Sequence, residues 1–151
     1  MLSDDEQQAW RERFRRHWTE GVAFNKACAM TVRRWDAGGV EMHLPFRDDL
    51  SAHPGVFHGG VVSALIDTAG CGAVAAGHDY DTGNRITTVA LAVQYLSADP
   101  GRGAVAAARC TRRGRQISFV EVSVHSDAGK LLAQGLVTVS VSGRRDLEPE
   151  P

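Results

Sequence analysis

The chain has 151 residues, which suits one domain with a single hydrophobic core. Its hydrophobic fraction is 43% and its formal net charge is -1, so overall charge favours neither a nucleic acid nor an anionic membrane as partner. The cysteines Cys28, Cys71 and Cys110 are far apart and form no Cys-x-x-Cys pair, so we expect free thiols and a cytoplasmic location rather than a disulfide framework.

No segment of the sequence is typical of a signal peptide or a membrane span. Residues 1–10 are acidic and polar, unlike a secretory signal. The longest apolar run, residues 61–76, contains Asp67 and is shorter than the roughly 20 residues that a membrane span needs. We therefore expect no membrane association.

An amphipathic helix is predicted at the N-terminus, over about residues 3–20. Ser3 followed by Glu6 is typical of a capping box. Aromatic and imidazole side chains then recur at helical spacing, at Trp10, Phe14, His17 and Trp18. The opposite face is charged, so we expect the helix to pack on the domain; the alternative is a helix that binds a partner or a membrane surface.

The middle of the chain predicts a hairpin and then a buried helix. Gly38-Gly39 is typical of the turn between two strands, at residues 30–36 and 40–44. Residues 45–53 have the composition of a loop. Residues 60–77 are small and apolar on nearly all sides, which predicts a helix buried in the core.

The last third of the chain predicts four strands. They cover residues 86–97, 103–112, 116–126 and 131–141, with turns at Gly-containing segments between them. We expect these strands to form a meander. The whole chain is then one α+β domain, with its core at about residues 28–142, in which an antiparallel sheet curls around one helix. The polar tail, residues 143–151, is expected to be disordered.

The start of the buried helix is the strongest candidate for a site. His58-Gly59-Gly60 leads directly into it, and two glycines let a ligand approach the backbone closely. The first turn of a helix has free N–H groups and a partial positive charge. The N–H groups of Gly60 and Val61 are therefore candidates for binding a carbonyl oxygen or an oxyanion.

Asp67 lies inside the same apolar helix, where an unpaired carboxylate is costly, so it has either a structural hydrogen-bond partner or a catalytic role. Gly60 and Asp67 are seven residues apart, which places them on one face and roughly 10 Å apart along the axis. One reacting carbon cannot contact both within one chain. We therefore expect a homodimer in which the glycine of one chain meets the aspartate of the other.

The stretch from His53 to Ala76, with residues 87–96, resembles the hotdog-fold acyl-CoA thioesterases of the phenylacetate-degradation type. The resemblance rests on His-Gly-Gly and the spacing from it to the aspartate of Asp-Thr-Ala, and it extends over about residues 30–141. It implies a hotdog fold, hydrolysis of an acyl-CoA or aryl-CoA thioester with no metal or cofactor, and a homodimer or homotetramer.

The resemblance also implies roles for individual residues. Gly60 would polarise the thioester carbonyl, and Asp67 of the partner chain would be general base or nucleophile. Thr88 would position the attacking water or the carboxylate, and His58 would hold the loop and could contact the thioester. Two departures concern how water is positioned: Ala52 stands where many members have Asn, and Ala90 where an acidic or amide residue is common.

Further substrate contacts are expected at Gly59 and Val61, and at a basic turn. Arg113 and Arg115 either clamp the phosphates of coenzyme A or form a solvated hairpin tip. Together with Arg112 they make three basic residues around this turn, too few to indicate nucleic acid binding.

Other readings of the site residues are less favoured. His53 and His58, with Asp67 and Cys71, lack a standard zinc spacing, so no metal is expected. Cys71 has the surroundings of a structural thiol rather than of a nucleophile. Two other functions stay open beside the thioesterase: a hotdog hydratase or dehydratase, and a non-catalytic acyl-CoA-binding module.

Overall fold

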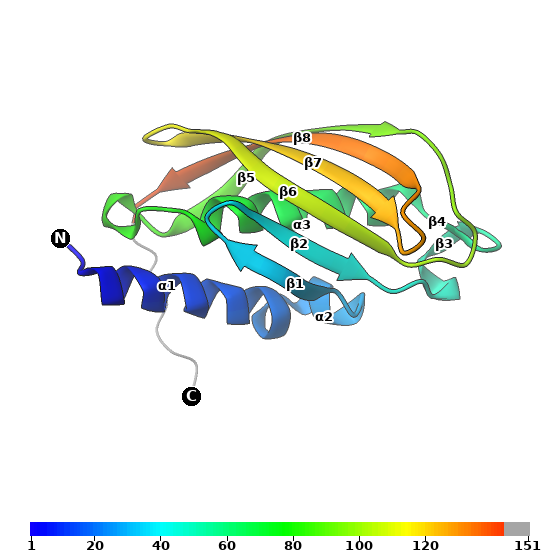
Figure 1. Ribbon diagram of the computed structural model, residues 1–151, viewed down its shortest axis with the longest axis horizontal. Helices are drawn as coiled ribbons and strands as arrows, with labels where there is room; N and C mark the ends of the chain where they lie inside the picture. The colour runs from blue at the N-terminus through cyan, green and yellow to red at the C-terminus, as the bar shows by residue number, and fades with distance from the viewer. Residues whose placement is uncertain (144–151) are drawn as a thin grey trace.

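The structure is a computed structural model that describes residues 1–143, so most of the predicted polar tail lies outside it (Figure 1). A six-stranded antiparallel sheet curls over one long helix, α3 (Gly59–Ala76). The strands are β1 (Thr31–Asp36), β2 (Gly39–Leu44), β5 (Arg85–Tyr95), β6 (Ala104–Arg113), β7 (Ile117–Ser126) and β8 (Leu131–Ser142). Their order in the sheet is β1-β2-β6-β7-β8-β5. This is the predicted α+β arrangement of sheet and buried helix.

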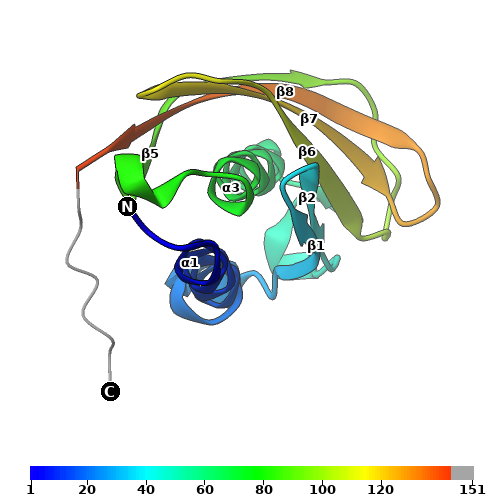
Figure 2. The same ribbon diagram turned by 60° about the vertical axis from the view of Figure 1, so that its left-hand side comes forward.

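The N-terminal helix α1 (Asp4–Arg16) packs on the side of α3 that the sheet leaves open (Figure 2). Both halves of the predicted capping box are present, between Ser3 and Glu6. The chain continues as a π-helical turn (His17–Gly21) and the short helix α2 (Ala23–Ala27). Aromatic contacts hold α1 on the domain: the ring of Phe14 stacks on Tyr80 and lies tilted against Trp10 and Trp18. The prediction that this helix packs on the domain is therefore confirmed.

Helix α3 is the centre of the core. By length and composition it could cross a membrane, with a mean hydropathy of 1.4 over 18 residues, but 56% of that window is buried inside the domain, as in the core helix of a soluble protein. Its small residues let the sheet come close: a Cβ added at Gly70 would lie 2.7 Å from Cγ2 of Val137 on β8. Close packing explains why this helix is rich in Gly and Ala.

The predicted four-strand meander is wrong for its first strand. Only β6, β7 and β8 form a meander, whereas β5 pairs with β8 at one edge of the sheet and β2 pairs with β6. The connection from β5 to β6 therefore crosses over two strands. The predicted loop at residues 45–53 also contains structure: a 3₁₀ turn (Asp48–Leu50) and the strand β3 (Ser51–His53), which pairs with β4 (Val56–Phe57).

Strand β5 is an edge strand with a bulge. Its pairing with β8 steps from Thr88↔Val139 to Ala90↔Thr138, so Val89 is one extra residue on β5. Large apolar side chains on this strand stay exposed, among them Val89 at 58%, Leu91 at 39% and Tyr95 at 56%. A long apolar edge without a covering element is a surface on which another strand can pair.

Candidate active site

The first turn of α3 is held by His58, which is its N-cap. The backbone N–H of Gly60 donates to Nδ1 of His58 over 2.8 Å, and the N–H of Val61 donates to the His58 carbonyl oxygen over 3.0 Å. The accepting ring nitrogen carries no proton, so this arrangement requires the neutral tautomer with its proton on Nε2. The two N–H groups that the sequence suggested for an oxyanion are therefore already bonded within the protein.

The N–H of Gly59 is different. Within residues 1–143 it donates to no hydrogen-bond acceptor, although it belongs to the same helical turn. It also lies at the positive end of the helix dipole. Gly59 rather than Gly60 thus supplies the free donor at this helix start, and the predicted role of Gly60 requires correction on that ground.

Asp67 lies two turns further along α3 and is bonded to β5. The hydroxyl of Thr88 donates to Oδ1 of Asp67 over 2.6 Å, and Sγ of Cys71 lies 3.0 Å from the same Thr88 oxygen. Because the single Thr88 proton is directed at the carboxylate, the thiol of Cys71 is the donor to Thr88. Burial raises the pKa of Cys71 to about 11, so the sulfur keeps its proton near neutral pH.

A second group of hydroxyls lies nearer the helix start, and sequence reasoning missed it. The hydroxyl of Tyr95, also on β5, donates to the carbonyl oxygen of Gly59 over 2.9 Å and contacts the hydroxyl of Ser63. The only signal in the sequence was that Gly59 and Ser63 are four residues apart, hence neighbours on one helix face. Where Tyr95 would lie depended on the pairing of β5, which the predicted meander had wrong.

The flank of α3 that carries these groups is incompletely covered. Gly60 is exposed, while Ser63, Ala64 and Asp67 are partly accessible. By contrast, Leu65 and Ile66 on the opposite flank have no exposed surface. The polar groups of α3 therefore lie on a partly accessible flank next to β5, which has exposed apolar side chains of its own.

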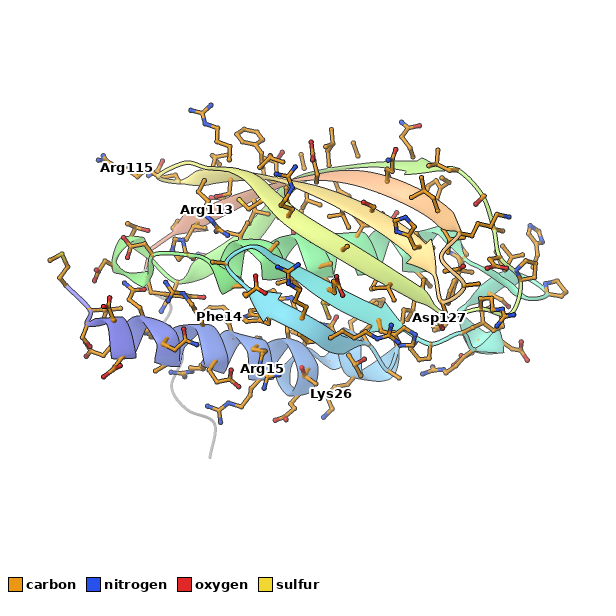
Figure 3. The ribbon with its side chains drawn as sticks, in the orientation of Figure 1. Phe14, Arg15, Lys26, Arg113, Arg115 and Asp127 are labelled. Atoms are coloured by element: carbon orange, nitrogen blue, oxygen red, sulfur yellow. The ribbon has the colours of Figure 1, made fainter. Side chains whose placement is uncertain are left out.

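The two arginines predicted to clamp phosphate do not act as a pair. The guanidinium of Arg113 donates to the carbonyl oxygens of Ala73 and Val74, each over 2.8 Å, and so caps the C-terminal end of α3. Arg115 is exposed at the tip of the turn between β6 and β7 (Figure 3). Of these two arginines, Arg115 is the one that does not bind the end of α3.

The residues weighed for a metal site do not gather. Among residues 1–143, no group of three or more His, Cys, Asp or Glu side chains is arranged to hold a metal ion. His58 uses Nδ1 on the helix start, and Asp67 uses one oxygen on Thr88.

Comparison with known proteins identifies the family. The family model of the thioesterase superfamily matches residues 54–133, the segment that holds the start of α3, Asp67 and β5. The chain belongs to the thioesterase superfamily. A Halobacterium salinarum protein provisionally named an esterase is 34% identical over 95 residues, which is 60% of this chain and 62% of that protein.

Solved structures agree with this thioesterase superfamily fold. A Haemophilus influenzae thioesterase aligns over 93% of this chain and 94% of its own, with 20% identity and a TM-score of 0.78. A hypothetical thioesterase of Streptococcus pneumoniae, solved with coenzyme A, covers 78% of this chain and 88% of its own, with 19% identity and a TM-score of 0.68. The hotdog fold is confirmed by this likeness and by the sheet order around α3.

Proposed function

We propose that the protein hydrolyses an acyl-CoA or aryl-CoA thioester to the free acid and coenzyme A. One observation carries the proposal: a carboxylate oriented by a hydroxyl, Asp67 with Thr88, lies on the partly accessible flank of a helix whose first N–H is free. Membership of the thioesterase superfamily supports thioester hydrolysis. Coenzyme A as the leaving group is supported by its presence in the Streptococcus pneumoniae relative.

In this proposal the Gly59 N–H binds the thioester oxygen. Negative charge builds up on that oxygen as the carbonyl carbon becomes tetrahedral, and a fixed N–H at a helix start stabilises it. Asp67 either removes a proton from the attacking water or attacks the carbonyl carbon itself. Thr88 donates to Oδ1 and so leaves Oδ2 free for that step.

The site requires two chains in this proposal. Gly59 and Asp67 are eight residues apart on one helix, or about 12 Å at 1.5 Å per residue, too far for both to contact one thioester. Pairing of two β5 edges about a two-fold axis would bring the uncovered flanks of two α3 helices together and cover the exposed side chains of β5. We therefore propose a homodimer with two equivalent sites, either alone or as half of a homotetramer.

The remaining parts of the proposal concern substrate and location. Arg115 would contact the phosphates of coenzyme A from the turn between β6 and β7. Val61, partly accessible in the first turn of α3, would border the acyl group. The three cysteines are free thiols, which suits a reducing cytoplasm.

The activity is tested by incubating the protein with a panel of acyl-CoA and aryl-CoA esters and measuring free thiol. We expect Asp67→Asn and Asp67→Ala to lower kcat by at least about a hundredfold. Asp5→Asn, which changes an exposed carboxylate on α1, is the matched control and keeps full activity. Full activity of both Asp67 variants would refute the role of this carboxylate; release of thiol from no ester would favour the binding module.

The donor is tested with two substitutions at Gly59, which occupies the first helical position. A Cβ there would lie 3.3 Å from the ring of Tyr95, in Gly59→Ala and Gly59→Pro alike, but only proline lacks the N–H. The ψ of 133° at His58 is compatible with a following proline. We expect kcat of the proline variant to be about a hundredfold below that of the alanine variant. Equal kcat values would exclude this N–H.

The shared site is tested by mixing Gly59→Pro chains with Asp67→Ala chains. Each mixed dimer would contain one site with both groups intact and one with neither, so activity returns as subunits exchange. Exchange is followed independently by mass spectrometry of differently tagged chains. No recovery in spite of complete exchange would show that each site lies within one chain.

A further inference from the structure

The peptide group between Gly59 and Gly60 is held at both of its polar atoms. Its carbonyl oxygen accepts a hydrogen bond from the Tyr95 hydroxyl over 2.9 Å, and its N–H donates to Nδ1 of His58 over 2.8 Å. The contact between the Gly60 N–H and His58 is an ordinary N-cap. The hydrogen bond from Tyr95 comes from a different element, β5. It fixes the plane of the peptide group that follows the free Gly59 N–H.

The hydrogen bonds around Tyr95 have a defined direction. The phenol has one proton, and the geometry directs it at the Gly59 carbonyl oxygen. The hydroxyl of Ser63, which contacts the Tyr95 oxygen, is therefore the donor in that contact. Ser63, Tyr95 and Gly59 form a directed chain of hydrogen bonds that ends on the first turn of α3.

The Tyr95 ring also lies against Gly59. A Cβ at this position would be 3.3 Å from Cζ and 3.5 Å from the hydroxyl oxygen, so the ring closes one side of the helix start. The side chain is 56% exposed, so it gains much less from burial than a core aromatic residue does. Within one chain, its hydroxyl contacts Gly59 and Ser63.

We propose that Tyr95, supported by Ser63, is a positioning residue that fixes the direction of the Gly59 N–H towards the thioester oxygen. This inference rests on the proposed function. A donor stabilises an oxyanion most when it needs no reorganisation during the reaction. Loss of the tyrosine hydroxyl leaves the Gly59 N–H in place but lets the first turn of α3 move. The loss therefore weakens stabilisation of the transition state, which lowers kcat, rather than substrate binding.

The matched pair of variants is Tyr95→Phe and Tyr80→Phe. Tyr80 donates its hydroxyl to the carbonyl oxygen of Ala75 over 2.8 Å, so the two variants remove the same kind of bond from opposite ends of α3. We expect Tyr95→Phe to lower kcat about tenfold with KM within about twofold, as for loss of one hydrogen bond that acts in the transition state. Tyr80→Phe lowers the melting temperature and leaves kcat unchanged.

Two further measurements keep the test independent of folding. Ser63→Ala retains the tyrosine and removes its donor, and we expect kcat to fall about threefold. In amide NMR spectra, Tyr95→Phe shifts the Gly59 and Gly60 signals and speeds their hydrogen exchange, whereas Tyr80→Phe does neither.

Three results would overturn the inference: kcat of Tyr95→Phe within twofold of the parent, an equal fall in kcat in Tyr80→Phe, or unchanged glycine amides. These results are separable from failure of the proposed function, since that is decided by whether the parent protein releases thiol and whether Asp67→Asn abolishes this release.

Discussion

The two halves of α3 have similar compositions and different surroundings. Every residue from 69 to 76 is buried, whereas residues 59–68 include exposed Gly60 and partly accessible Ser63, Ala64 and Asp67. Both halves consist mainly of small and apolar residues. Composition therefore explains why this helix suits the core, whereas its neighbours determine which half has side chains accessible to a substrate.

The neighbours differ in kind. In the second half, Arg113 and Tyr80 donate to carbonyl oxygens of its last turn. These contacts satisfy backbone groups that a helix end leaves without partners. In the first half, the neighbour on the open flank is the edge strand β5, whose hydroxyls contact individual polar groups. The first half is therefore expected to govern activity and the second half stability.

The same substitution in both halves gives the largest expected effect. Ala69→Leu adds volume where no surface is exposed, and we expect the free energy of unfolding to fall by about 3 kcal/mol. Ala64→Leu, on the partly accessible flank, is expected to cost less than about 1 kcal/mol and to lower kcat/KM by crowding the surface near Asp67. Urea unfolding and thiol-release kinetics measure the two. Equal losses of stability would show that the two halves are equally packed.

The next largest effect concerns the Thr88 hydroxyl, which donates to Asp67. Thr88→Val keeps the shape of the side chain and removes the donor to a carboxylate, a bond worth about 1.5–3 kcal/mol. We expect kcat to fall by about tenfold to a hundredfold with little change in the melting temperature, and Thr88→Ser to recover most of the loss. A valine variant as active as the parent would remove Thr88 from the site.

A smaller effect separates the two arginines of the basic turn. Arg113→Ala removes two hydrogen bonds to the end of α3, and because the residue is exposed we expect a loss of only about 1–2 kcal/mol, with kcat unchanged. Arg115→Ala leaves stability unchanged and raises KM for coenzyme A esters severalfold. Thermal unfolding and KM measurements distinguish the two. A rise in KM for Arg113→Ala alone would reverse these assignments.

The smallest effect is expected at Cys71. Since burial raises its pKa to about 11, the thiol is protonated below that pH and becomes a thiolate only above it. We therefore expect Cys71→Ser, which keeps a donor to Thr88, to retain kcat within about threefold. Iodoacetamide is expected to label Cys71 slowly at pH 7–9, as followed by mass spectrometry. Complete inactivation of the serine variant would make Cys71 a nucleophile and contradict this account.

Much of the fold was predictable because local patterns are strong here. The capping box of Ser3, the Gly38-Gly39 hairpin and the apolar run of α3 each depend on residues close in sequence. The place of β5 was not predictable, because the partner of a strand is set by long-range packing rather than by its neighbours along the chain. The meander was accordingly wrong at that strand.

The residues of the candidate site stand out in the sequence, whereas the hydrogen bonds between them do not. Asp67 was conspicuous as a carboxylate in an apolar helix, and its contact with Thr88 agrees with the role expected for that threonine. Which N–H stays free at the helix start depends on the orientation of one imidazole, that of His58, and no pattern in the sequence reports it. Tyr95 was missed because an aromatic residue in a strand reads as a core residue.

The extra residue on β5 has a consequence for the whole site. Thr88 and Tyr95 are seven positions apart, an odd number, and strict alternation along a strand would put them on opposite faces. Both nevertheless contact α3, because the bulge at Val89 changes the parity of the strand between them. The alternation of side chains along β5 therefore changes phase at Val89, so that both hydroxyls face α3. Deletion of one residue at Val89 would restore strict alternation, and only one of the two hydroxyls could then face the helix.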